Sequence, residues 1–158
     1  MTVALYPGSF DPVHNGHLAL VELASGLFEA VVVGVGHNPQ KPSGLFTPDE
    51  RVEMICAEIA GLGNVRFELF SGLVTEAARR LGATCLLKGI RGAADLDAEL
   101  QQAHMNRSAG GVPTVFLPAV SEAAFVASRY IREIAAMGGD VRAVVPPAVA
   151  DRLQEKLR

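Results

Sequence analysis

The chain has 158 residues, of which 49% are hydrophobic and 20% are charged, proportions typical of a soluble globular domain. This composition excludes a disordered chain, a collagen-like chain and a coiled coil, and the length predicts a single domain over residues 1–158. The formal net charge of -3 argues against a general nucleic-acid-binding protein, so a polyanionic ligand requires a local cluster of cations.

The compartment is predicted from the N-terminus and the cysteines. No apolar run approaches the ~18 residues that a membrane span needs, and the N-terminus lacks the basic segment of a secretory signal. The two cysteines, Cys56 and Cys85, lie far apart in the sequence and form no C-x-x-C pair. We therefore expect a cytoplasmic protein with reduced thiols and no membrane contact.

Apolar runs alternate with amphipathic stretches along the whole chain. In chain order, we expect a strand at 3–6, a helix at 16–28, a strand at 30–35, a helix that begins after residue 47, a strand at 65–70, a helix at 73–81, a strand at 84–87, a helix at 94–106, a strand at 114–117 and helices at 128–137 and 147–157. This alternation predicts an α/β fold, a Rossmann-like, doubly wound, five-stranded parallel sheet with helices on both faces.

The second of these helices has the clearest start signal. Thr47 is a typical N-cap, Pro48 suits the first helical position, and Glu50 is placed to complete a capping box. Apolar residues then recur at helical spacing, which predicts that Cys56 lies in the core.

In such sheets, ligands bind beyond the carboxyl ends of the strands, which directs attention to residues 7–17. Gly8 and Ser9 offer donors at the strand exit, while His14 and His17 lie three apart at a helix start and can face one site. A helix N-terminus can seat a phosphate, and an imidazole can donate a hydrogen bond to developing negative charge. The alternatives are two solvated histidines in a turn-rich loop, or a metal site without a third ligand at the usual spacing.

The residues around these histidines carry a family resemblance. The sequence PGSFDP at 7–12, followed by HNGH at 14–17, resembles the H-x-G-H element of nucleotidyltransferases and, in particular, of the phosphopantetheine adenylyltransferase family. Three further segments agree, namely NPQK at 38–41, TPDER at 47–51, and KGIR at 88–91 with Glu99 and HMN at 104–106. The resemblance extends from about residue 3 to the C-terminus.

The resemblance implies that AMP is transferred from ATP to 4′-phosphopantetheine, with Mg²⁺, giving dephospho-coenzyme A and pyrophosphate. It implies that His17 stabilises the transition state. For ATP binding it implies the following residues: Ser9, Phe10, His17, Gly89, Ile90, Arg91, Glu99, Ala123, Ala124, Phe125, Val126, Ala127, Ser128 and Arg129. For the acceptor it implies Ser9, Lys41, Val74 (through its backbone) and Lys88. A homohexamer, and coenzyme A as a feedback ligand, are also implied, and no residue is assigned as a metal ligand.

The chemistry of the residues is consistent with these roles. The attacking phosphate monoester is already ionised at neutral pH, so catalysis needs positioning and charge stabilisation rather than a general base. Lys41, Lys88, Arg91 and Arg129 are the cations available for this purpose. Each has an alternative, since Lys41 can be a solvated loop lysine and Arg91 can pair with Asp95 or Glu99 on the following helix.

One departure from the family concerns residues 126–129, where the family usually carries a serine run. Ser128 is present, whereas Arg129 places a long cation where a small hydroxyl is usual, and it either binds the β- or γ-phosphate or crowds that site. Two other functions stay open, a related adenylyltransferase that acts on nicotinamide mononucleotide and an inactive nucleotide-binding homologue. Lys41 and the motif at 88–91 favour phosphopantetheine.

Overall fold

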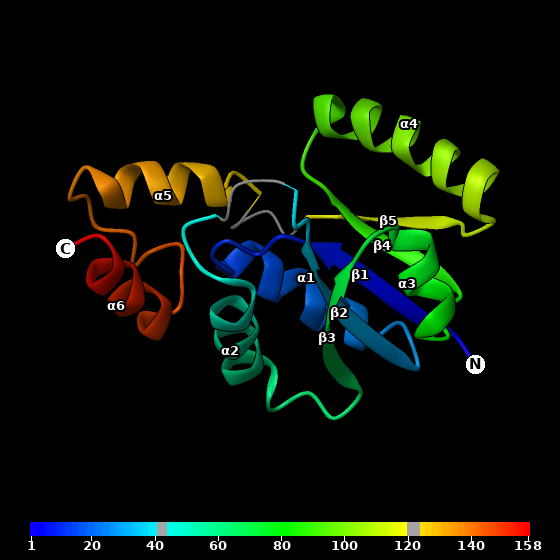
Figure 1. The fold of residues 1–158 in the computed structure, drawn as a ribbon, viewed down its shortest axis with the longest axis horizontal. Helices are drawn as coiled ribbons and strands as arrows, with labels where there is room; N and C mark the ends of the chain where they lie inside the picture. The colour runs from blue at the N-terminus through cyan, green and yellow to red at the C-terminus, as the bar shows by residue number, and fades with distance from the viewer. Residues whose placement is uncertain (41–43, 120–123) are drawn as a thin grey trace.

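A single parallel sheet organises the chain, and the computed structural model describes it at residues 1–40, 44–119 and 124–158 (Figure 1). In these ranges the strands are β1 (Val3–Gly8), β2 (Ala30–His37), β3 (Val65–Ser71), β4 (Cys85–Ile90) and β5 (Thr114–Pro118), in the order β3-β2-β1-β4-β5. All neighbouring pairs are parallel. The predicted Rossmann-like, doubly wound α/β fold is confirmed.

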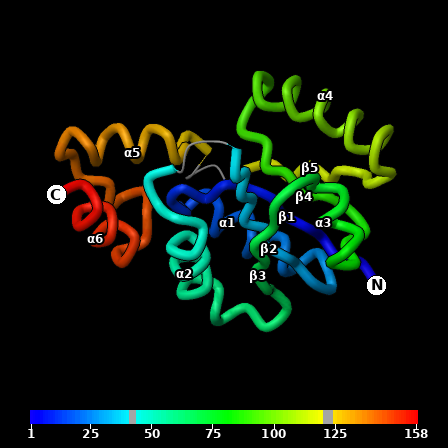
Figure 2. The backbone as a smooth tube through the Cα atoms, in the orientation of Figure 1, coloured from blue at the N-terminus to red at the C-terminus, as the bar shows by residue number. Residues whose placement is uncertain are grey.

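Helices cover both faces of the sheet. They are α1 (Asn15–Ser25), α2 (Pro48–Ile59), α3 (Val74–Arg80), α4 (Ala93–Gly110), α5 (Ser128–Ala136) and α6 (Pro147–Lys156). Side chains alternate along β1, so Ala4 and Tyr6 join the larger core with α1, α2, α5 and α6, while Val3 and Leu5 join a smaller core with α3. Figure 2 shows α5 and α6 at the end of the molecule away from the N-terminus.

All five strands end later than the sequence predicts, and the ends of β1 and β4 shape the later site. We expected β1 to end at residue 6 and β4 at residue 87, but they extend to Gly8 and Ile90 because their outer neighbours continue to pair with them. Between themselves, β1 and β4 pair only as far as Leu5 and Leu86. Pro7 follows, and it has no N–H to donate. The two central strands therefore part at their carboxyl ends.

The predicted start of α2 is confirmed, but one of its core residues is not. The Thr47 hydroxyl accepts from the Glu50 backbone N–H at 3.2 Å, and the Glu50 carboxylate accepts from the Thr47 N–H at 2.7 Å. The prediction that Cys56 lies in the core is wrong, because the buried stripe of the helix runs through Met54, Ile55 and Ile59. This stripe leaves Cys56 half-buried at its edge.

The lengths and compositions of the helices bear on membrane contact. In the ranges that the structure describes, no helix has the length and apolar character that crossing a membrane would need.

The packing of α6 gives a stability prediction. Leu153 is fully buried, whereas Leu157, four residues later, is 37% exposed. Leu153→Ala should lower the free energy of unfolding by about 2–5 kcal/mol, because it removes buried methylenes and leaves a cavity. Urea denaturation measures this, and Leu157→Ala is the matched control with a much smaller loss. Equal losses in the two variants would contradict the described packing of α6.

Candidate functional site

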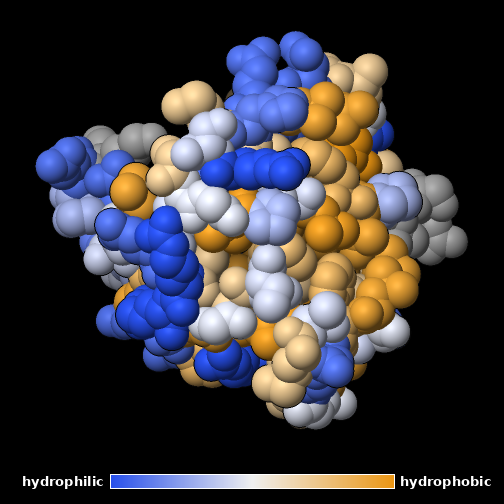
Figure 3. Space-filling view, turned by 90° about the vertical axis from the view of Figure 1, so that its right-hand side faces the viewer, coloured by the Kyte–Doolittle hydropathy of each residue, from blue (hydrophilic) through white to orange (hydrophobic). Residues whose placement is uncertain are grey.

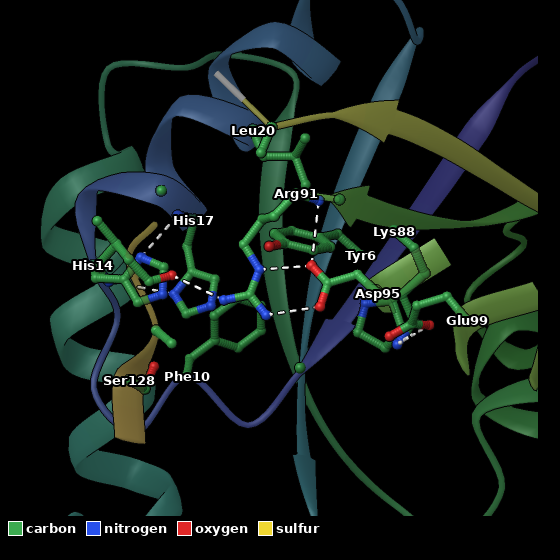
Figure 4. A pocket seen from close by; sticks show the side chains of 17 residues that line it. Tyr6, Phe10, His14, His17, Leu20, Lys88, Arg91, Asp95, Glu99 and Ser128 are labelled. Carbon is green, nitrogen blue, oxygen red and sulfur yellow. Dashed lines mark hydrogen bonds and ion pairs between the residues drawn. The ribbon is translucent and has the colours of Figure 1, made fainter. Parts of the chain in front are cut away.

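A cavity of about 290 Å³ lies where β1 and β4 part, at the point where the strand order reverses (Figure 4). Residues at the ends of both strands, the start of α1, the first turns of α4 and the segment before α5 line it. Among the residues predicted for the site, it brings together Phe10, His17, Lys88, Gly89, Arg91, Glu99, Val126, Ala127 and Ser128.

Two histidines close the N-terminus of α1 reciprocally. His14 is the N-cap, and its Nδ1 accepts from the His17 backbone N–H at 3.3 Å. In return, the Nδ1 of His17 accepts from the His14 backbone N–H at 3.3 Å. The two rings stack with their centroids 3.6 Å apart and an angle of 18° between their planes. A capping box usually combines a hydroxyl with a Glu or Gln side chain, and here two imidazoles accept the two equivalent hydrogen bonds.

This arrangement settles where the imidazole protons lie. Since each Nδ1 accepts a hydrogen bond, each neutral ring carries its proton on Nε2, which makes that atom a donor. Burial, with the nearby charges of His14 and Arg91, holds the pKa of His17 well below its usual value. Burial and Arg91 lower the pKa of His14 to about 4. Both rings are therefore neutral at pH 7, and both line the cavity.

Aromatic contacts fix the ring of His17 from its other side. The ring of Phe10 meets that of His17 edge-on at 4.8 Å and that of Tyr6 at 5.4 Å, measured between centroids. Phe10 has a φ of 48°, which is unusual for a bulky residue. A Cβ on Gly8 would come within 2.9 Å of the Phe10 ring, so glycine at this position permits the close approach.

Two cations from the end of β4 reach the cavity, each beside a carboxylate of α4. The Nε of Arg91 donates to Asp95 at 2.7 Å and its Nη2 at 3.1 Å, and these bonds raise the pKa of Arg91 and lower that of Asp95. Lys88 Nζ lies 3.2 Å from Glu99 Oε2. The alternative in which Arg91 pairs with a carboxylate of the next helix is therefore present in the structure, with Asp95 as the partner.

These ion pairs make the cavity less positively charged than the sequence predicts. Asp95 and Glu99 lie one helical turn apart, so both face the cavity and offset the charges of Lys88 and Arg91. Arg91 also donates from Nη1 to the Val126 carbonyl at 3.2 Å, which joins the start of α4 to the segment before α5. Asp95 is a site residue that was not predicted, although its i, i+4 spacing from Arg91 and from Glu99 was a usable signal.

Some predicted residues lie elsewhere. Ser9 is exposed and lines a second cavity of about 560 Å³ with Gly36, Asn38 and Arg132. Val74 begins α3 and is half-buried. In the described part of the chain, Val74 is on the wall of neither cavity.

The remaining predicted residues that the structure describes are not among those that line the first cavity. Ile90 ends β4, and Ala124 and Phe125 precede the cavity-lining segment, with Phe125 72% exposed. The guanidinium of Arg129 lies over the ring of Tyr130 at 4.4 Å and donates to its hydroxyl. Lys41 and Ala123 lie outside the described residues.

The metal alternative for the two histidines finds no additional ligands. Within residues 1–40, 44–119 and 124–158, no three or more His, Cys, Asp and Glu side chains are grouped as metal ligands would be. The Nδ1 atoms of both histidines are already engaged in the cap. The described residues therefore fit a site made of hydrogen-bond donors better than a metal centre held by protein.

Comparisons with known proteins show which family the sequence resembles. The sequence model of the cytidylyltransferase-like family matches residues 5–134. The phosphopantetheine adenylyltransferase of Heliobacterium modesticaldum is 46% identical, over 99% of this chain and 93% of that protein. That of Streptomyces coelicolor is 42% identical, over 100% and 99%.

Solved structures share the fold at low sequence identity. A bifunctional NMN adenylyltransferase/ADP ribose pyrophosphatase from Francisella tularensis, complexed with AMP and Mn, superposes with a TM-score of 0.69 at 14% identity. The likeness covers 98% of this chain and 48% of that one, so this chain spans about half its length. A protein from Vibrio parahaemolyticus assigned as a nicotinate-nucleotide adenylyltransferase gives a TM-score of 0.67 at 20% identity, over 99% and 95% of the chains.

The histidine cap makes stability depend on pH. His14 has a folded pKa of about 4, below the value of about 6.5 expected in the unfolded chain. The unfolded state therefore binds more protons between these values, and stability that is fully present above pH 6.5 is lost as the pH falls toward 4. In His14→Asn, which keeps an N-cap acceptor, urea denaturation at pH 7 and pH 5 should show a smaller loss. An identical loss in both proteins would contradict the assignment.

Proposed function

The chain belongs to the cytidylyltransferase-like family and, within it, to the phosphopantetheine adenylyltransferases, and from this premise we propose that it transfers AMP from ATP to 4′-phosphopantetheine. The products are dephospho-coenzyme A and pyrophosphate. The observation that carries the proposal is the reciprocal histidine cap, which presents neutral Nε2–H donors in a cavity at the switch point of the sheet.

The reaction suits a site of this kind. An oxygen of the 4′-phosphate attacks the α-phosphorus of ATP, the bond between that phosphorus and the bridging oxygen to the β-phosphate breaks, and pyrophosphate leaves with the electron pair. The attacking oxygen is already ionised, so no side chain has to take a proton. Negative charge rises on the oxygens around the α-phosphorus, and preorganised donors stabilise that charge.

His17 is the residue we assign to this charge. Its cap bond fixes the tautomer, and the stack on His14 with the edge contact to Phe10 fixes the ring plane. The N-terminus of α1 adds the positive end of the helix dipole at the same place. A donor held in this way needs little reorganisation when the charge develops.

Lys88 and Arg91 supply positive charge. In the described structure, both are held near the cavity by Glu99 and Asp95. Both cations are therefore positioned before a substrate binds. The incoming phosphates then offer them a second anionic partner. We assign Lys88, with Ser9, Lys41 and Val74, to the acceptor, and Arg91 with the other residues predicted for ATP to the nucleotide.

The metal ion, the assembly and the compartment complete the proposal. Mg²⁺ would accompany ATP, as the family resemblance implies, and would offset part of the charge of its phosphates. Phe67 and Leu69 on β3 are exposed apolar side chains of the kind that subunit interfaces cover, and the family resemblance implies that the assembly is a homohexamer. Figure 3 shows further hydrophobic areas on one face of the molecule. We also propose a cytoplasmic location and feedback binding of coenzyme A, which the family resemblance implies.

The acceptor assay tests the function directly. Purified protein with ATP and Mg²⁺ is given 4′-phosphopantetheine or nicotinamide mononucleotide, and pyrophosphate release is measured. We expect turnover with phosphopantetheine alone. Turnover with the mononucleotide alone would overturn the substrate, and no turnover with either would overturn the transferase activity itself.

The role of His17 gives a second prediction. His17→Ala should lower kcat by about 10²–10³-fold while the KM values of both substrates stay within about threefold, because the lost donor acts on the transition state. His17→Gln is the control for the helix cap, since Gln suits this position of a capping box. It should fold with near-native stability and still lose kcat. A raised KM at unchanged kcat in His17→Ala would contradict the assigned role.

A further inference from the structure

A buried carboxylate belongs to the loop between β1 and α1. It lies outside the first cavity, which His14 and His17 line and which we call the histidine cavity. Asp11 is 4% exposed, and its two oxygens accept the backbone N–H groups of Phe46 and Leu45, both at 2.9 Å. These donors belong to the segment before α2, more than 30 positions along the chain. The carboxylate thus joins the connections that follow β1 and β2.

Arg51 of α2 completes this cluster. Its guanidinium is buried, with Nε 3.5 Å from Asp11 Oδ1. The same side chain donates from Nε to the Phe46 carbonyl at 2.9 Å and from Nη1 to the Ser9 carbonyl at 3.2 Å. A buried guanidinium is costly unless it is paired and hydrogen-bonded, and here both conditions are met.

The helix α5 holds the same loop from the other side. Arg132 donates from Nη1 to the Asp11 carbonyl, and the Ser128 hydroxyl donates to the Pro12 carbonyl at 2.9 Å. Three carbonyls of the loop, at Ser9, Asp11 and Pro12, therefore accept hydrogen bonds from α2 and α5. Hydrogen bonds from α2 therefore hold the backbone before Phe10, and hydrogen bonds from α5 hold the backbone after it.

Phe10 connects this cluster to the histidines. Its backbone has a φ of 48°, and its ring meets His17 at 4.8 Å. Because Arg51 binds the carbonyl just before Phe10, and Asp11 follows it, the position of the ring depends on both. Neither Asp11 nor Arg51 is on the wall of the described histidine cavity, although both border the second cavity.

We propose that Asp11 and Arg51 are positioning residues for the adenylyl transfer, which hold the Phe10 ring against His17 and so fix the orientation of its imidazole. The inference rests on the proposed function for its kinetic consequence. Its structural part, the link from Arg51 through Phe10 to His17, stands apart from the identity of the substrate.

Arg51→Lys is the sharpest test of this link. Lysine keeps the positive charge opposite Asp11, but its single nitrogen cannot bond to the Ser9 and Phe46 carbonyls in the geometry of the guanidinium. We expect kcat to fall about 10–100-fold, the scale of a small misplacement at a reacting centre, with the KM of ATP and of phosphopantetheine within about threefold. A raised KM for phosphopantetheine at unchanged kcat would instead mean direct contact in the second cavity and would overturn the proposal.

Two controls on α2 and α6 separate positioning from general destabilisation. Ile59→Val removes a buried methylene from the same helix as Arg51, far along it from the loop. Arg152→Lys alters the exposed 3.0 Å pair between α6 and Glu53 of that helix. Both should keep wild-type kcat at a temperature where they are folded. A kcat loss in Ile59→Val equal to that in Arg51→Lys would overturn the proposal.

A readout that needs no turnover completes the test. The ring current of Phe10 is expected to change the chemical shifts of the carbon-bound protons of the His17 imidazole. In Arg51→Lys these chemical shifts should move toward those of a histidine exposed to solvent. Phe10→Leu leaves the buried charges intact and should reproduce both the signal change and the kcat loss, even if the Arg51 variant does not fold. Wild-type signals and kcat in Phe10→Leu would overturn the proposal, whereas an inactive wild-type protein with the predicted signals would count against the function alone.

Discussion

The reciprocal hydrogen bonds between His14 and His17 are the constraint on which the site depends. They satisfy two backbone donors at the start of α1 and, in doing so, commit both Nδ1 atoms as acceptors. As a consequence, each ring carries its proton on Nε2, and burial keeps both rings uncharged. A structural requirement of a helix terminus and a chemical requirement of the proposed reaction are thus met by the same pair of bonds.

The cavity itself results from the sheet. β1 and β4 pair only up to Leu5 and Leu86, and Pro7 then has no N–H with which to continue. The strands separate at the switch point, and α1 begins beside the gap. Ligand-binding crevices at this position are a general property of doubly wound sheets, so the fold explains the place of the site, and the histidines explain its chemistry.

Local electrostatics differ from those of a simple basic pocket. The chain has a net charge of -3, and the described cations at the cavity are accompanied by Asp95 and Glu99. We therefore infer that anion recognition depends on oriented donors, the end of α1 and paired cations, rather than on an excess of positive charge.

The sequence predicts most of the fold and the centre of the site. Strand and helix patterns, the Thr47 cap and the placement of His14 and His17 toward one site are local, because they depend on residues within one or two turns. The reciprocal hydrogen bonds between the two histidines were not predicted. The ends of β1 and β4 are set by neighbouring strands, and Cys56 lies just beside the stripe that tertiary packing selects.

The Asp11–Arg51 cluster lies beyond local prediction for the same reason. The hydrogen bonds that link its two loops join residues 34 to 42 positions apart in the sequence. No spacing within one element indicates which buried carboxylate will meet which arginine. Only the approach of the loops after β1 and β2 brings them together.

NMR of the side-chain nitrogens of His14 and His17 at pH 7 shows which atoms carry the imidazole protons. We expect both rings to be neutral, with an unprotonated Nδ1 that accepts a hydrogen bond and a proton on Nε2. A positively charged His17, or a neutral His17 with its proton on Nδ1, would mean that the helix cap does not set the donor of the site.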